Sequence, residues 1–541
     1  MEADLLCDGH DPLAGVLRVR HDGDRRWTEI PLEPLVNDRW RARFRVEKLG
    51  TYRYTLAGWV QGREKSGRAT LYDKELTVRV DREKARFSSW YELFPRSYAL
   101  EPGRHGTFRE LEAHLPYVAS MGFDVLYLTP IHPIAHTQRK GRNNALTSQP
   151  GDPGSPWAIG SREGGHKHVH PELGTLEDFR RFLRRAGEFG LEVALDIALQ
   201  CSPEHPYVRE HPEWFRKRPD GTLQHAENPP KKYEDIHPFD FETKHRQVLW
   251  EEMKSIFEFW IRQGVRIFRV DNPHTKPFDF WEWLITEIKK KHPDVLFLSE
   301  AFTRPKAMYR LAKLGFTQSY TYFCWRNSRG ELADYFTELT RPPVKEFFRP
   351  SVWPNTPDIL TATLQEGGPA AFRVRLVLAA TLSGSYGIYG AAFELCESQP
   401  REPGSEEYLN SEKYELKRWE LERPDSLKEL IARVNRIRRE NPALQTDEGL
   451  AFHPVDNDRI LCYSKSSRDG NSRMVMVVNL DPRQKQAGTV DLPVESLGLA
   501  PDRPYKVRDL LSDSAYDWRG SRNYVELDPA RAPAHLFRLG G

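Results

Sequence analysis

The sequence has few cysteines, no long apolar run and no excess of charge of one sign. Its five cysteines in 541 residues are far apart and include no CxxC pair, which argues against a zinc site or a disulfide framework. The 80 basic and 78 acidic residues nearly cancel, which argues against a nucleic-acid or membrane-surface partner. No apolar stretch approaches the length of a membrane span, and the first residues, MEADLLCDGHDPLAG, do not read as a signal peptide. We therefore expect a cytoplasmic protein with reduced thiols.

The chain is rich in apolar and aromatic residues. Hydrophobic residues make up 39% of it and aromatic residues 11%, with 14 Trp. A chain of 541 residues is too long for one compact core, so two or three domains are expected. The aromatic content fits either a large core or flat rings on which sugars stack, and composition does not decide between them.

Both ends of the chain read as β-sandwich domains, because short runs alternate apolar and polar positions between turn residues. We assign residues 1–86 to an N-terminal sandwich and residues 446–541 to a C-terminal one. The N-terminal strands are expected at 16–21, 40–46, 51–59 and 76–81, with a polar connector at 61–74. The C-terminal strands are expected at 459–467, 474–480, 488–493, 505–511, 523–528 and 534–539.

The middle of the chain, residues 87–445, alternates apolar strand-like runs with amphipathic helical segments. The runs lie at 89–97, 124–131, 192–199, 266–271, 295–302, 319–323, 349–358 and 385–390. Eight such units predict an α/β domain with the (β/α)₈ barrel fold. Two long loops, 132–172 and 201–245, follow barrel strands, and the second is expected to form a subdomain after the third strand. Active sites of such barrels lie at the end of the barrel where these loops follow the strands.

Four carboxylates stand at the ends of strand-like runs: Asp196, Asp271, Glu300 and Asp358. A single strand-end acid is as often solvated or helix-capping, but four of them converge on one face of a barrel. Retaining glycosyl transfer needs one carboxylate as nucleophile and another as acid and base. Arg269 shares a strand face with Asp271 and is expected to keep it ionised, whereas Glu300 is expected to have a raised pKa.

These motifs resemble those of a known family. GVRIFRVD, FLSEAF, WPNTPD and VALDIALQ resemble the four motifs of the α-amylase clan, glycoside hydrolase family 13. The longer strings KGRNN, SPWAIGSREGGH, AENPPKKYEDI, RVDNPHTKP, SEAFTRP and YLNSEKYE are similar to those of the GlgE-type maltosyltransferases. Such enzymes move a maltosyl unit from α-maltose 1-phosphate to the non-reducing end of an α-1,4-glucan and release phosphate. The resemblance covers essentially the whole chain.

The resemblance implies roles for particular residues. Asp271 forms a β-maltosyl ester, Glu300 is the acid/base, and Asp358 stabilises the transition state through sugar hydroxyls. The phosphate is expected near four side chains that supply donors to an anion: Ser155, Asn228, Lys231 and Tyr233. The donor sugars are expected to be held by Lys140, Gln200, Asn272, Lys413 and Tyr414, with Arg269 beside the nucleophile. No cofactor is implied.

The sequence departs from the amylase pattern at three positions. Gln200 and Cys201 stand where amylases carry an Asn and a His, so the usual calcium ligand is missing and we expect no calcium. Pro357 replaces the His before the third carboxylate, a change that the maltosyltransferase pattern shares.

The His-rich strings HPIAH and GGHKHVH fit no common zinc spacing, so no metal is expected.

A further departure concerns the N-terminal domain. Family members carry a long helical insert there, which contributes to their dimers, whereas this chain has only the connector at 61–74. A homodimer is therefore in doubt for this chain.

Two other functions remain open from the sequence. One is a hydrolase or phosphorylase of the same clan on another α-glucoside, which the NPPKKY loop would distinguish: Lys231→Ala should then impair sugar-phosphate and neutral-glucan reactions equally. The other is a glycan-binding protein without activity, although such proteins generally lose catalytic carboxylates and this chain keeps all three.

Overall fold

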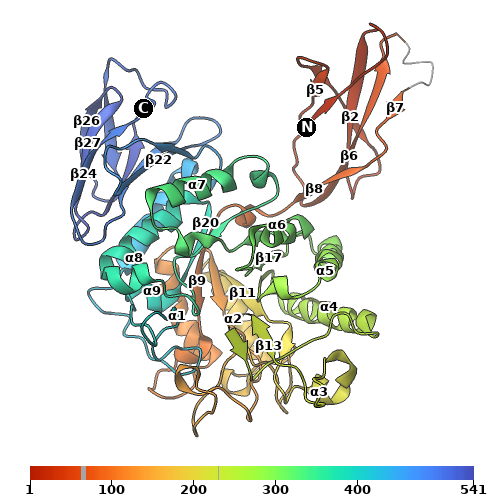
Figure 1. Ribbon diagram of the computed structural model, residues 1–541, viewed down its shortest axis with the longest axis vertical. Coiled ribbons are helices and arrows are strands. Elements are labelled where there is room, and N and C mark those ends of the chain that lie inside the picture. Colours follow the sequence, from red (N-terminus) through yellow and green to blue (C-terminus); the bar gives the residue numbers. More distant parts are fainter. Residues whose placement is uncertain (63–68, 229–230, 541) are drawn as a thin grey trace. The chain divides into compact units, whose positions relative to one another are not determined.

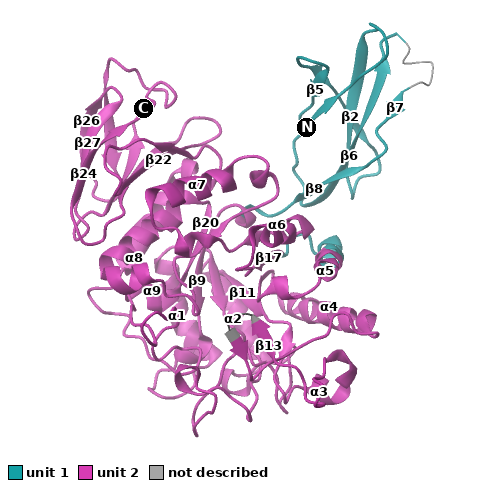
Figure 2. Cartoon of the chain, in the orientation of Figure 1, with its two compact units in different colours: residues 1–83, 286–295 teal, residues 84–285, 296–541 magenta. Residues whose placement is uncertain are grey.

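The computed structural model describes residues 1–62, 69–228 and 231–540, and of Asn228 and Lys231 only the backbone. The chain forms two compact units, residues 1–83 with 286–295, and residues 84–285 with 296–541 (Figure 2). Within the described ranges, no helix combines the length and the apolar character that crossing a membrane requires.

The first unit consists of two antiparallel sheets around a small apolar core. Its strands are β1 (Glu2–Asp4), β2 (Leu13–His21), β3 (Thr28–Pro31), β4 (Glu33–Pro34), β5 (Arg39–Arg41), β6 (Gly50–Val60), β7 (Thr70–Leu71) and β8 (Leu76–Val80). One sheet has the order β1-β5-β4; the other has the order β3-β2-β6-β7, with β8 also paired to β6. The strand expected at 40–46 is shorter than predicted, since β5 ends at Arg41. Of the connector at 61–74, residues 63–68 lie outside the described part, and β7 occupies Thr70–Leu71.

The second unit holds an eight-stranded parallel sheet with the order β18-β17-β16-β11-β10-β9-β20-β19. The strands are β9 (Ser88–Leu93), β10 (Val125–Leu128), β11 (Glu192–Ile197), β16 (Ile267–Val270), β17 (Leu296–Ser299), β18 (Gln318–Ser319), β19 (Ser351–Val352) and β20 (Ser385–Tyr389). A parallel bridge between Ser319 and Pro350 joins the two edge strands of this order. Neighbours along the chain are therefore neighbours in the sheet, as the predicted (β/α)₈ barrel requires.

Helices alternate with the barrel strands (Figure 1). They are α1 (Phe108–Ser120), α2 (Leu176–Glu188), α4 (Arg246–Gln263), α5 (Phe278–Lys291), α6 (Pro305–Leu314), α7 (Arg329–Thr340), α8 (Ala362–Leu382), α9 (Gly390–Glu394) and α10 (Lys428–Glu440). Local sequence explains several of their starts. For example, the Thr107 side chain accepts the backbone N–H of Glu110, and the Glu110 carboxylate reaches back to the Thr107 N–H, which forms a capping box before α1.

The barrel interior is packed with large side chains. Trp90, Tyr127, Tyr320 and Trp353 belong to one buried cluster there. Gly387 on β20 faces this cluster, and a Cβ at that position would lie 2.3 Å from the Trp353 ring. The wide indole therefore fits only because position 387 has no side chain.

A subdomain follows the third barrel strand, as predicted. It contains β12 (Gln200–Cys201), α3 (Pro206–Glu210), β13 (Ala226–Asn228), β14 (Lys231–Tyr233) and β15 (His237–Pro238). The strands β13 and β14 pair as an antiparallel hairpin, with Asn228 opposite Lys231.

The C-terminal strands form the predicted second sandwich (Figure 1). They are β21 (Ala451–His453), β22 (Ile460–Ser466), β23 (Arg473–Asn479), β24 (Gln486–Asp491), β25 (Pro504–Asp509), β26 (Ala515–Arg519), β27 (Arg522–Leu527) and β28 (Ala534–Leu539). Antiparallel sheets of order β21-β22-β23-β28-β25-β26 and β24-β27 enclose a common apolar core.

Candidate active site

A cavity of about 530 Å³ gathers residues from the loops that follow barrel strands. Nine of the side chains predicted from the sequence line it: Lys140, Ser155, Gln200, Tyr233, Asp271, Asn272, Asp358, Lys413 and Tyr414. Arg269 and Glu300 are buried next to Asp271 and do not line the cavity in this structure.

The guanidinium of Arg269 joins three carboxylates. Its Nη1 lies 2.8 Å from Asp271 Oδ1 and 3.0 Å from Asp196 Oδ2, and its Nη2 lies 3.3 Å from Glu300 Oε1. Asp196 also accepts hydrogen bonds from Tyr127 Oη at 2.5 Å and Trp157 Nε1 at 3.2 Å. Because Asp196 is fully buried in these contacts, it anchors Arg269 and does not face the cavity.

Asp271 presents its two carboxylate oxygens differently. Oδ1 accepts the short bond from Arg269, whereas the contacts of Oδ2 with the described residues are longer, at 3.4 Å, from the amide nitrogens of Gln200 and Asn272. The charge-assisted bond from Arg269 fixes Oδ1, so the weakly held Oδ2 is the better placed oxygen for attack.

Glu300 is held by a backbone donor and by burial. The Asn272 N–H donates to Glu300 Oε2 at 3.0 Å, from a residue in the left-handed conformation (φ 41°) that Asn tolerates. Burial raises the pKa of Glu300 to about 7, while Arg269 acts in the opposite direction. The carboxyl can therefore hold or release a proton near neutral pH.

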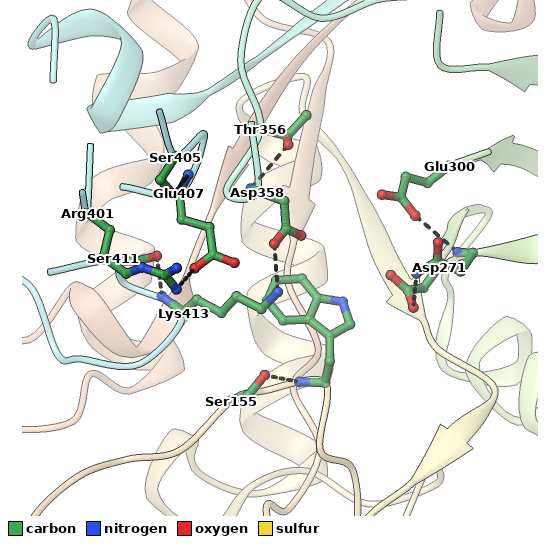
Figure 3. Close-up of polar contacts among 12 residues, drawn as sticks. Ser155, Asp271, Glu300, Thr356, Asp358, Arg401, Ser405, Glu407, Ser411 and Lys413 are labelled. Carbon is green, nitrogen blue, oxygen red and sulfur yellow. Dashed lines mark hydrogen bonds and ion pairs between the residues drawn. The ribbon is translucent and has the colours of Figure 1, made fainter. Parts of the chain in front are cut away.

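Lys413 and Asp358 form the opposite wall of the site (Figure 3). The ammonium of Lys413 lies 2.8 Å from Asp358 Oδ1. It also lies 5.1 Å from the Trp157 ring centroid and 5.8 Å from that of Tyr233. Burial lowers the pKa of Lys413, but the Asp358 carboxylate, together with Tyr414 and Tyr233, raises it overall, so Lys413 is a cation.

The remaining predicted residues lie around this wall. Lys140 is buried, and its ammonium lies 2.5 Å from Glu234 Oε2. Burial raises the pKa of Tyr233, which keeps its hydroxyl a donor at neutral pH. The side chains of Asn228 and Lys231 lie outside the described residues, although their backbones stand in the same hairpin as Tyr233.

The sequence did not single out several residues of the cavity wall, among them Trp157, Phe241, His274 and Lys276. Lys276 donates to the Asn272 carbonyl at 3.2 Å, and burial lowers its pKa to about 8. Trp157 and Lys276 stood within strings that carried the family resemblance, but neither follows a strand, so position alone did not mark them.

Of the two residues at the calcium positions, Cys201 has no side-chain oxygen to offer that ion. Cys201 is fully buried and burial raises its thiol pKa, while Gln200 contacts Asp271. In the described part of the chain, His105, His170 and Glu172 place possible ligand atoms within 4.8 Å of one another. His170 Nδ1, however, accepts the backbone N–H of Glu172, which leaves the proton on Nε2 of the neutral ring and opposes metal binding there.

Solved structures with similar folds include several α-amylases. The α-amylase of Geobacillus thermoleovorans, complexed with acarbose, matches with a TM-score of 0.66 and 15% identity, over 84% of this chain and 98% of that one. The α-amylase of Lactobacillus plantarum matches with a TM-score of 0.62 and 21% identity, over 84% and 100%. These likenesses support the barrel fold.

Family models cover much of the chain. Residues 1–82 match the domain N/S of alpha-1,4-glucan:maltose-1-phosphate maltosyltransferase, 92–265 the alpha amylase catalytic domain, and 452–539 the GLGE C-terminal domain.

Curated relatives match over the full length. An alpha-1,4-glucan:maltose-1-phosphate maltosyltransferase of Methylacidiphilum infernorum is 51% identical over 612 positions, covering 100% of this chain and 92% of the relative. That of Chlorobaculum tepidum is 48% identical, with 100% and 92% covered. Because 612 aligned positions exceed the 541 residues here, the first relative carries residues that this chain lacks. On this identity and coverage, the chain belongs to the alpha-1,4-glucan:maltose-1-phosphate maltosyltransferase family.

Proposed function

We propose that this protein transfers a maltosyl unit from α-maltose 1-phosphate to the non-reducing end of an α-1,4-glucan, with retention of configuration and release of inorganic phosphate. The observation that carries the proposal is the arrangement around Arg269. One buried guanidinium holds Asp271 and Glu300 together beside a cavity that also contains Lys413 and Tyr233.

In the first step, Asp271 Oδ2 attacks the anomeric carbon of the donor. The bond from that carbon to the phosphate oxygen breaks, and a β-maltosyl ester forms. Phosphate is a good leaving group, so Glu300 has little protonation to do here. The Tyr233 hydroxyl, with Ser155 and the expected Asn228 and Lys231, offers donors to the departing anion.

In the second step, a 4-hydroxyl of the acceptor glucan attacks the same carbon. Glu300 takes the hydroxyl proton, the ester bond breaks, and Asp271 is restored as a carboxylate. We assign to Asp358 and Lys413 the binding of donor-sugar hydroxyls, together with Lys140, Gln200, Asn272 and Tyr414. These are charged, amide or phenol groups on the cavity wall, suited to fixing hydroxyl positions.

The test is incubation of the purified protein with α-maltose 1-phosphate and a maltooligosaccharide. Phosphate release should accompany growth of the acceptor in steps of two glucose units, with little release when the acceptor is absent. Growth in single glucose steps, or phosphate release that ignores the acceptor, would contradict the proposal. The sequence leaves a homodimer in doubt, and analytical ultracentrifugation decides it. A cytoplasmic location stays a prediction from the sequence, which cell fractionation tests.

A further inference from the structure

Three buried histidines outside the cavity take no part in the proposed reaction. His132, His166 and His205 are each no more than 2% exposed. His166 lies in the loop between β10 and α2, and His205 precedes α3 in the subdomain. Their side chains link these segments to the turn that follows β11.

The hydrogen bonds of His205 and His166 form a series in which the donor of each bond is defined. A backbone N–H can only donate, so the bond from Tyr207 N to His205 Nδ1, at 3.1 Å, makes Nδ1 an acceptor. The proton of neutral His205 is then on Nε2, which donates to His166 Nδ1 at 3.1 Å. The proton of His166 is in turn on Nε2, which donates to the Ala198 carbonyl at 2.9 Å. Burial lowers the pKa of His166 to about 4, so the neutral ring that this series needs is the form present at neutral pH.

The position of His205 is fixed by its neighbours. A Cβ at Gly160 would lie 2.3 Å from its ring, and a Cβ at Gly165 would lie 2.0 Å from its Nε2. The backbone therefore contacts the imidazole closely, and the ring cannot turn without moving this loop.

This series of hydrogen bonds ends next to the proposed nucleophile, Asp271. The Ala198 carbonyl that accepts from His166 also accepts the Gln200 N–H at 2.9 Å, which closes a tight turn. The Gln200 side chain then reaches Asp271 Oδ2 at 3.4 Å. A displaced Ala198 carbonyl would move Gln200 away from the attacking oxygen.

We propose that His166 is a positioning residue for glycosyl transfer, which holds the Ala198–Gln200 turn so that the Gln200 amide reaches Asp271. His205 sets the tautomer that lets His166 donate to Ala198. The inference rests on the proposed function, because it assigns Gln200 and Asp271 to the transfer reaction.

Two substitutions of His166 test its hydrogen bonds to His205 and Ala198 independently. In His166→Asn, the side-chain oxygen can still accept from His205, but the side chain is too short to reach Ala198. In His166→Gln, an amide nitrogen takes the place of imidazole Nε2 and can still donate to Ala198. The matched control is His132→Asn, since His132 is equally buried with its ring 5.9 Å from His166 and its Nδ1 bonded to the His168 carbonyl.

The decisive measurement is a double-mutant cycle with Gln200→Ala, in which phosphate release is followed at saturating acceptor. We expect His166→Asn to lower kcat roughly tenfold, with the KM for the donor within about twofold, and to cost less than about twofold once Gln200 is already Ala. His166→Gln should recover most of the loss, and His132→Asn should keep the parent kcat. An equal loss in both backgrounds, or an equal loss in His166→Asn and His132→Asn, overturns the inference.

A second donor and a second variant distinguish a failure of this inference from a failure of the proposed function or of folding. Running the cycle on α-maltosyl fluoride as well removes the need for phosphate recognition. If the parent protein ignores maltose 1-phosphate but the fluoride cycle is non-additive, the proposed function fails and this inference stands; inactivity on both donors overturns both. Should His166→Asn not fold, His205→Asn, which keeps an acceptor for Tyr207 N and removes the donor to His166, must show the same coupling to Gln200→Ala.

Discussion

The ammonium of Lys413 lies 2.8 Å from Asp358 Oδ1, although 55 positions of sequence separate the two residues. Lys413 approaches the site from the segment after α9, whereas Asp358 follows β19. Lys413 thus fixes the Asp358 carboxylate, to which we assign the binding of sugar hydroxyls, and the aromatic rings of Trp157 and Tyr233 flank the ammonium.

We therefore predict that Lys413→Met, which keeps the length of the side chain and removes its charge, lowers kcat/KM for maltose 1-phosphate. A hydrogen bond to a charged group contributes roughly 1.5–3 kcal/mol, which corresponds to a loss of about 10- to 150-fold. Initial rates of phosphate release measure it. Lys428→Met is the control, because Lys428 also lies over an aromatic ring, Tyr117 at 4.2 Å, but does not line the cavity; comparable losses in both variants would contradict the prediction.

The second prediction concerns pH and Glu300. Burial raises the pKa of this carboxyl to about 7 in the folded protein, from 4.5. A proton bound more tightly in the folded state stabilises it fully below pH 4.5, and this stabilisation is lost as the pH rises through 7. The melting temperature of the parent, relative to Glu300→Gln, should therefore fall between pH 5 and pH 8, by an amount that reflects up to about 3 kcal/mol. Thermal melts of both proteins across this range test it, and a difference that does not vary with pH would show that Glu300 is ionised throughout.

Much of the fold followed from the sequence because barrel strands are buried runs with clear boundaries. The strand expected at 319–323 is an exception: β18 covers only Gln318–Ser319, and Thr321 then caps a 3-10 helix at Tyr322–Trp325. Aromatic residues favour strands in a sequence, but here Tyr320 stacks on Trp353 at 4.9 Å, and this tertiary contact overrides the local preference.

The residues of the site also fall into two groups, those that strand ends predict and those that loop conformations place. Strand ends predict where Asp271 and Glu300 lie, because the barrel brings its strand ends together. They do not predict Lys276, whose place on the cavity wall depends on the left-handed backbone at Asn272 and the 3-10 helix Pro273–Thr275. Loop conformations of this kind depend on contacts distant in sequence, so spacing does not reveal them.

The third prediction tests phosphate recognition. Tyr233→Phe removes a hydroxyl donor from the cavity wall and should lower kcat/KM for maltose 1-phosphate by roughly 10- to 150-fold, the range of a lost bond to a charged group. With α-maltosyl fluoride, which carries no phosphate, the same variant should lose little. Tyr414→Phe is the matched comparison, because we assign Tyr414 to the donor sugars and expect equal losses on both donors. Equal losses in Tyr233→Phe would favour a clan enzyme that acts on a neutral α-glucoside.

The last prediction concerns the packing beneath the site. Gly387→Ala places a Cβ 2.3 Å from the Trp353 ring, which is buried with Trp90 and Tyr320 and cannot move aside without disturbing the barrel. Overpacking of this kind typically costs about 1–3 kcal/mol, so the melting temperature should drop. Gly330→Ala is the control: Gly330 is the second residue of α7, with nothing within 4 Å of its added Cβ. Because it lies in the first turn, Ala there should stabilise the protein by less than the about 0.5–1 kcal/mol of a helix interior. Scanning calorimetry shows whether each variant melts below or above the parent. A Gly387→Ala protein that melts at or above the parent temperature would show that the barrel interior has room to adapt.

Because Tyr320, which stacks on Trp353, lies 5.8 Å from the Arg269 guanidinium, Gly387→Ala should also slow maltosyl transfer, whereas Gly330→Ala should leave it unchanged.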